Sequence, residues 1–170
     1  MSATHPPPTI CLFTCTGSEQ QVLEHHKLIG SAPLWKSVHT DQWRAYLHQA
    51  APQTHGLTVE LQPLNALQGH QHGQQGAYHY IVETDISPEN EAEFNDWYNT
   101  EHLTGLASVP GTISAHRYLR SSGAPRYIAC YELTSPEVMQ SPQWLAVRHT
   151  NWSSRVRPMF LNTVRQLFTR

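Results

Sequence analysis

Residues 94–103 (FNDWYNTEHL) place several chemically active side chains at helical spacing. In a helix, positions three and four apart lie on the same face, so Phe94, Trp97, Tyr98, Glu101 and His102 form one broad stripe. The stripe combines an imidazole, a carboxylate and a phenol with two apolar rings. Such a mixture is typical of a pocket wall, whereas a core face carries mainly aliphatic residues. The stretch therefore predicts a small-molecule pocket.

His102 is the candidate for acid or base chemistry, because an unperturbed imidazole changes its charge near neutral pH. Tyr98 lies one turn earlier and could donate a hydrogen bond to His102 or to a substrate. Glu101 points about 100° away around the helix and is less suited to the same cavity. Phe94 and Trp97 would form the apolar wall. In the alternative interpretation, His102 ends a helix and its positive form is favoured by the helix dipole.

The elements around this stretch follow a recognisable order. We predict a strand over 77–86, the helix over 89–107, strands over 112–120 and 126–134, and a helical region from 135 toward 155. Val164, Leu167 and Phe168 suit a closing strand or a docked tail. This βαββαβ order is the ferredoxin-like arrangement, an α+β fold with an antiparallel sheet that has helices on one face. The sheet's bare face needs a cover, which is normally a second copy of the same unit.

The first part of the chain resembles a degenerate second copy of this ferredoxin-like unit. We predict a loose leader over 1–8, a strand over 9–16, a helix over 18–29 capped by Ser18 with Gln21, and a short strand over 34–39. A second helix over 41–50, with Trp43 on its apolar face, and a strand over 57–62 ended by Pro63 would follow. This order matches the βαββαβ arrangement except that one strand is missing. We therefore predict a degenerate N-terminal half, 1–75, and a C-terminal domain, 76–170. The barrel closes within one chain, as a pseudo-dimer, or between two chains of a homodimer.

Strand alternation assigns further residues to faces but does not decide which face meets the helices. His116 and Tyr118 share one face of their strand. Arg126 and Tyr131 lie on opposite faces of the next strand. We take all four as candidate substrate-binding residues beside Phe94 and Trp97.

Charge and composition narrow the classes of partner. Lys and Arg number 11, Asp and Glu 13, and the formal net charge is -2. No basic patch for nucleic acid or for an anionic membrane is expected. No apolar run reaches the roughly 20 residues that span a bilayer, and residues 1–8 lack a signal-peptide pattern. We therefore expect a cytoplasmic protein whose partner is a small-molecule substrate.

Cysteine and histidine spacing predicts neither disulfides nor a metal site. The chain has 3 Cys, an odd number, and Cys11 and Cys15 share a strand face at a distance that a disulfide cannot bridge. Free buried thiols are expected. His70 and His72 lie in the glycine-punctuated stretch 69–76, which we take as a loop, and two histidines lack the further ligands of a metal site. Arg148, Arg155 and Arg157 make the last helical region basic, which would attract an anionic ring.

The segment 80–160, about half the chain, resembles the dimeric α/β-barrel superfamily and, within it, the EthD-like group named for ethyl tert-butyl ether degradation. The resemblance is carried by EFNDWYNTEHL at 93–103, VPG at 109–111, HRY at 116–118, PRY at 125–127 and YEL at 131–133. It implies a relation to polyketide cyclases and dehydratases, cofactor-independent monooxygenases and haem-degrading enzymes. Thr104 stands where such sequences commonly have Pro, which leaves the end of the helix open.

Together these features predict a small-molecule enzyme that works by cofactor-independent proton transfer, as a cyclase, dehydratase or isomerase, on an aromatic or polyketide-like substrate. His102 would be the general acid or base, and Tyr98 would donate a hydrogen bond to a developing enolate oxygen. A non-catalytic ligand-binding or assembly module is the first alternative. The second is a haem-binding or monooxygenase-type member, in which His102 is an axial ligand.

Overall fold

The computed structural model describes residues 10–22, 32–48 and 56–170. The predicted leader, most of the helix over 18–29 and residues 49–55 lie outside the described residues. That helix begins at Glu19, and the Ser18 backbone N–H donates to Gln21 Oε1 over 3.1 Å, which is the predicted capping contact.

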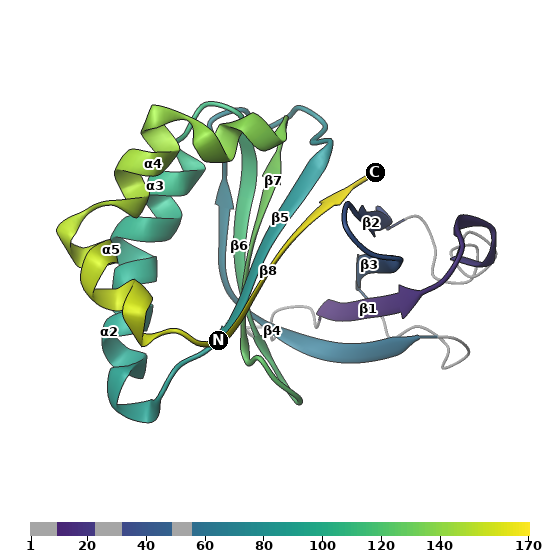
Figure 1. Ribbon diagram of the computed structural model, residues 1–170, viewed down its shortest axis with the longest axis horizontal. Helices are drawn as coiled ribbons and strands as arrows, with labels where there is room; N and C mark the ends of the chain where they lie inside the picture. Colours follow the sequence, from purple (N-terminus) through teal and green to yellow (C-terminus); the bar gives the residue numbers. More distant parts are fainter. Residues whose placement is uncertain (1–9, 23–31, 49–55) are drawn as a thin grey trace, which may run out of the picture.

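The described strands close into a barrel in which every neighbouring pair is antiparallel (Figure 1). The strands are β1 (Ile10–Thr16), β2 (Trp35–Ser37), β3 (Gln42–Leu47), β4 (Leu57–Gln68), β5 (Tyr78–Asp85), β6 (Thr112–Arg120), β7 (Tyr127–Leu133) and β8 (Leu161–Thr169). Their order around the barrel is β1-β3-β2-β8-β5-β7-β6-β4. The runs β4-β1-β3-β2 and β8-β5-β7-β6 repeat one ferredoxin-like order, so the barrel closes within one chain.

The predicted helix over 41–50 is wrong, because residues 42–47 form strand β3. The spacing of Trp43, Tyr46 and Leu47 fits a helix, but Trp43 and Leu47 also alternate with a strand period. Trp43, Ala45 and Leu47 pack in one cluster with Cys11, while β3 pairs with β1 and β2 on its two sides. Pairing with both neighbours outweighs local propensity. The N-terminal half therefore has the strand that the prediction left out.

The predicted end of this strand at Pro63 is also wrong, because β4 continues past it. The strand continues to Gln68, and its register with β6 shifts between Pro63 and Asn65. Because proline has no N–H to donate, a bulge is one of the few places where a strand tolerates it.

A helical layer covers the outer face of the C-terminal strands (Figure 1). Its first part runs without a break through η1 (Pro88–Asn90), α2 (Glu91–Trp97), the π-helical turn η2 (Tyr98–His102) and α3 (Leu103–Ala107). The second part is η3 (Pro136–Gln140), α4 (Pro142–Arg148), α5 (Asn151–Val156) and η4 (Arg157–Met159). The predicted α+β fold is confirmed, and Thr104 does not end the helix.

Alternation divides the C-terminal strands between two interiors. On β5, Tyr80 faces the helical layer, whereas His79 and Ile81 face the inside of the barrel. On β7, Tyr131 belongs to the helix-side cluster and Cys130 to the barrel-side cluster. The sheet therefore separates two compartments.

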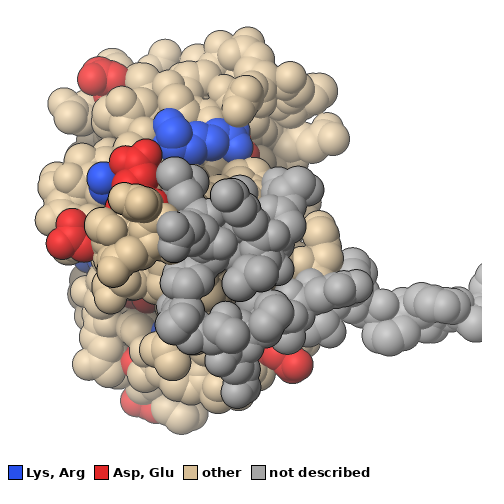
Figure 2. Space-filling view, turned by 90° about the vertical axis from the view of Figure 1, so that its right-hand side faces the viewer, with Lys and Arg blue, Asp and Glu red and all other residues tan. Residues whose placement is uncertain are grey.

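Cys11, Cys15 and Cys130 are free and buried, as expected for the described cysteines. No helix in the described part of the chain is long and apolar enough to cross a membrane. On the side presented by the N-terminal strands, the described surface is mainly uncharged, with few Lys and Arg side chains (Figure 2).

Candidate functional site

The site is organised by the π-helical turn Tyr98–His102, in which the Leu103 N–H donates to the carbonyl oxygen of Tyr98, five residues earlier. In a regular α-helix, residues five apart point about 140° away from each other. The wider turn brings them to the same side, so the rings of Trp97 and His102 stack with centroids 4.0 Å apart and planes at 20°. Tyr98 meets His102 edge-on at 5.3 Å. Single π-turns inside α-helices are frequent at functional sites.

His102 is a buried, neutral imidazole. It is 7% exposed, and its Nδ1 has no hydrogen-bond partner among the described residues. Burial, reinforced by the charges of Arg157, Arg148 and Arg117, lowers the pKa of His102 to about 3. The imidazole can therefore accept a proton or a hydrogen bond throughout the neutral range, which differs from the unperturbed titration expected from sequence. Because α3 continues beyond it, His102 does not end the helix.

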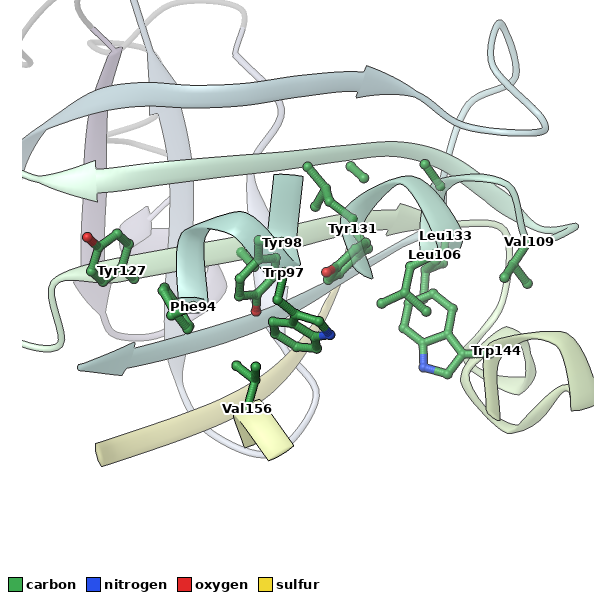
Figure 3. Close-up of a cluster of buried hydrophobic side chains, with 14 of the residues drawn as sticks. Phe94, Trp97, Tyr98, Leu106, Val109, Tyr127, Tyr131, Leu133, Trp144 and Val156 are labelled. Carbon is green, nitrogen blue, oxygen red and sulfur yellow. The ribbon is translucent and has the colours of Figure 1, made fainter. Parts of the chain in front are cut away.

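A narrow cavity between the helical layer and the sheet contains His102. It leaves about 30 Å³ for the centre of a water molecule. Its aromatic lining is Tyr80, Trp97, Tyr98, Tyr131, Trp144 and Phe160. Figure 3 shows Trp97 and Tyr98 extending from the helix toward Tyr131 of β7, with Trp144 of α4 at one end. Rings from both parts of the helical layer and from strands β5 and β7 thus line one space.

The tyrosines of this cavity are protonated hydrogen-bond donors. Burial raises the pKa of Tyr98 to about 12, although Arg117 opposes that effect, and burial also raises the pKa of Tyr131 and Tyr80. The Oη atom of Tyr131 is buried without a hydrogen-bond partner among the described residues. A buried polar group without a partner is costly, so a ligand that bonds to Tyr131 would recover that free energy.

Arg148, Arg157 and Arg165 line the same cavity. None of the three pairs with a carboxylate within the described chain. Burial and the nearby Arg148 and Arg165 lower the pKa of Arg157, whose NH1 donates to the Arg148 carbonyl oxygen over 3.3 Å. Unpaired cations attract an anion or a group that gains negative charge during a reaction. Arg148 and Arg157 belong to the basic region noted in the sequence, whereas Arg165 was not expected.

Arg117 is a further buried cation that the sequence did not identify. It is 1% exposed and donates to the amide oxygens of Asn95, Asn99 and Asn65 over 2.7, 3.2 and 3.2 Å. Its guanidinium lies 4.1 Å from the ring centroid of Tyr98. Asn95 is half-buried, with its amide oxygen bonded to Arg117. Arg117 thus adds positive charge behind the site.

The predicted site residues divide into two groups. Trp97, Tyr98, His102 and Tyr131 meet in the cavity. Phe94 is fully buried beside Tyr98 in the core and does not line it.

The other three predicted residues lie elsewhere. His116 and Tyr118 face the barrel interior, and Arg126 is 48% exposed and pairs with Glu91 over 3.4 Å. A shift of one residue exchanges the two faces of a strand, so sequence alone could not assign His116 and Tyr118. Three aromatic lining residues were not selected from the sequence. Tyr80 could have been found, because strand alternation places it on the opposite face from His79. No feature of the sequence points to Trp144 or Phe160.

Among the described residues, no three His, Cys, Asp or Glu side chains lie together as a metal site.

Comparisons with known proteins show the fold. No family model and no curated protein matches the chain. A crystal structure of a putative monooxygenase from Lactobacillus acidophilus matches with a TM-score of 0.64 at 12% identity, covering 95% of this chain and 93% of that one. A haem-degrading enzyme from Listeria monocytogenes matches with a TM-score of 0.65 at 11% identity, covering 94% and 98%. An anthrone oxidase-like protein matches with a TM-score of 0.64 at 11% identity, covering 99% and 93%. The chain therefore shares the ferredoxin-like fold of these proteins, and membership of the dimeric α/β-barrel superfamily and of its EthD-like group stays a prediction.

Proposed function

We propose that this protein is an enzyme that moves a proton on a small aromatic or polyketide-like ketone or phenol without a cofactor, as a cyclase, dehydratase or isomerase does. The observation that carries the proposal is the Nδ1 atom of the neutral His102, which has no hydrogen-bond partner in the described part of the chain and lies in a cavity that arginines also line. A neutral base next to fixed positive charge favours removal of a proton from a substrate that becomes an anion.

In this proposal His102 accepts the proton, and the substrate oxygen gains negative charge. The protonated phenols of Tyr98 and Tyr131 donate hydrogen bonds to that oxygen, and Arg148 and Arg157 stabilise its charge electrostatically. Trp97 stacks on the imidazole and fixes its plane. The anion in turn stabilises the imidazolium, which raises the pKa of His102 only while substrate is bound.

The cavity must widen to admit a substrate, since it now leaves room for about two water molecules. Arg148 and Arg157 are half-exposed, and Arg165 is exposed. Long side chains of this kind can move without unfolding the helical layer. We therefore place the opening on the arginine side.

A second candidate is a cofactor-independent monooxygenase. The same proton removal would give an enolate that reacts with O₂, with water as the second product. Names of fold neighbours, a putative monooxygenase and an anthrone oxidase-like protein, favour this candidate. It uses the same residues and differs only in the next step, in which the enolate reacts with O₂.

Haem suits the cavity poorly. An imidazole and several arginines are the donor types that a haem iron and its carboxylates use. However, Tyr80, Tyr131 and Trp144 line the same narrow cavity as His102, and a haem would need far more widening of this cavity of about 30 Å³ than a ligand of two or three rings.

Deuterium exchange tests the proposal. Anthrone has an acidic CH₂ group that is conjugated with its carbonyl through the two outer rings, and 2-tetralone has one that lies between its ring and its carbonyl. NMR measures their exchange in D₂O under nitrogen. We expect catalysed exchange by the wild-type protein and a loss of roughly 10²- to 10⁴-fold in His102→Gln, as for loss of a general base. His149→Gln, at an exposed histidine in the same helical layer, is the matched control.

Exchange no faster than in buffer with both ketones, or equal rates in wild type and His102→Gln, would refute the proton-transfer mechanism. Repeating the assay in air separates the candidates, because oxidation of anthrone to anthraquinone that depends on His102 supports the monooxygenase.

A further inference from the structure

A second and larger cavity lies inside the barrel, on the opposite side of the sheet from the His102 cavity. It measures about 180 Å³. Inward-facing side chains of β2, β3, β5, β6 and β7 line it, among them Trp35, Tyr46, His79, His116 and Tyr118. The barrel ends of small proteins are a common place for ligand sites. The proton-transfer proposal uses none of these residues.

The rings of this cavity are arranged in parallel pairs. Trp35 and His79 stack with centroids 5.0 Å apart and planes at 24°. His116 and Tyr118, two residues apart on β6, have planes at 3°, and Tyr46 and Tyr118 have planes at 26°. Flat faces on several sides of one cavity suit a flat ligand, which gains contact area and stacking without any change of side-chain conformation.

Polar atoms without partners accompany the rings. His79 is 6% exposed, and its Nε2 lies 2.9 Å from Tyr46 Oη, but its Nδ1 has no hydrogen-bond partner among the described residues. The side chains of Ser114, His116 and Tyr118 likewise make no hydrogen bond within the described chain. Since buried polar groups are normally bonded, His79 Nδ1 suits a ligand hydroxyl group, and the half-exposed Ser114 and His116 offer further polar atoms beside it.

The one carboxylate in the lining of this cavity, Glu132, is already neutralised. Glu132 accepts from Arg170 over 2.7 Å and from the Gly76 N–H over 3.1 Å. Farther along the barrel and outside this lining, Glu83 pairs with both Arg44 and Arg120, each over 2.9 Å, so that one positive charge remains in excess there. Burial and the charge of Arg44 keep His79 neutral by lowering its pKa. An uncharged ligand therefore matches the lining better than an ion does.

We propose that the barrel interior binds a small, uncharged, planar aromatic molecule of one or two fused rings that carries a hydroxyl or carbonyl group. Its rings stack among Trp35, His116 and Tyr118, and its polar group bonds to His79 or Ser114. This site is separate from the His102 cavity, because the β5–β7–β6 sheet lies between them.

Calorimetric titration of the full chain with 2-naphthol tests the proposal. We expect saturable binding that weakens at least tenfold in Ser114→Trp, which fills a half-exposed position in the lining, and in His116→Leu. His102→Gln retains this binding, and His70→Leu in the loop is the matched control. Naphthalene-2-carboxylate, the anionic analogue, binds at least tenfold more weakly than 2-naphthol.

Three results would overturn the proposal: no saturable heat with wild-type protein up to 1 mM 2-naphthol, unchanged affinity in a folded barrel variant, or loss of binding in His102→Gln. Thermal melts establish which variants fold. If Ser114→Trp does not, the affinity of His116→Leu decides.

Discussion

Two histidines, His79 and His102, lie on opposite faces of the same sheet, and burial is the main reason that the pKa of each falls to about 3. An unfolded chain would protonate both near the ordinary histidine pKa of about 6.5. Between these values the unfolded state binds more protons than the folded state. Stability is therefore fully present above about pH 6.5 and is lost as the pH falls toward 3.

This linkage predicts how acid unfolds the protein. Each buried histidine should reduce the free energy of unfolding by up to about 1.4 kcal/mol for each pH unit below 6.5. Urea unfolding of wild type, His79→Gln and His102→Gln between pH 7 and pH 4 measures it. We expect a shallower loss in each variant, whereas exposed His149→Gln should follow wild type. Parallel curves for all four proteins would show that neither imidazole is held neutral.

At the scale of elements, sequence periodicity identified the helix over 89–107, β5 to β8 and the loop at 69–76 correctly, because their local patterns agree with their tertiary setting. It missed β3, where one set of apolar residues fits both periods and only pairing with β1 and β2 decides. Sequence periodicity also did not predict the π-helical turn Tyr98–His102. The stripe of Trp97, Tyr98 and His102 was predicted for a regular α-helix. The stacking of Trp97 on His102 instead depends on the wider π-helical turn.

The docking of α5 on α2 depends on one buried hydroxyl. Ser153 is fully buried, accepts from Trp97 Nε1 over 3.3 Å and donates to the Val147 carbonyl oxygen over 2.9 Å. Ser153→Ala leaves both groups without a partner, so we expect it to lower the free energy of unfolding by about 1–3 kcal/mol. Chemical denaturation measures the change. Ser154→Ala, on the exposed side of α5, should change it by less than about 0.5 kcal/mol. Equal effects of the two substitutions would show that Ser153 does not hold α2 in place.

At the scale of the whole molecule, the two four-strand runs are joined inside the barrel by charge as well as by backbone pairing. Glu83 of β5 lies between Arg44 of β3 and Arg120 of β6, so one carboxylate from the C-terminal half holds a cation from the N-terminal half. Arg44 is 1% exposed. No pattern in the sequence indicated this link, because it depends on the closure of the barrel.

Removing that carboxylate should weaken the whole barrel. Glu83→Gln leaves Arg44 buried without a countercharge, and we expect a loss of about 3–5 kcal/mol of unfolding free energy. Glu93→Gln, which breaks the exposed pair with Arg155, should cost less than about 1 kcal/mol. Urea unfolding at pH 7.5 compares the two variants. A loss for Glu83→Gln no larger than for Glu93→Gln would contradict a structural role for the buried link.

The protonation state of His102 tests the central claim most directly. Nitrogen-15 NMR of histidine-labelled protein, with the signal assigned by its absence in His102→Gln, follows the imidazole from pH 8 to pH 5. We predict a neutral ring throughout this range, with a signal that shifts when anthrone is added. A titration midpoint near 6.5, or a signal that does not respond to the ketone, would show that His102 is not an enclosed base facing a substrate.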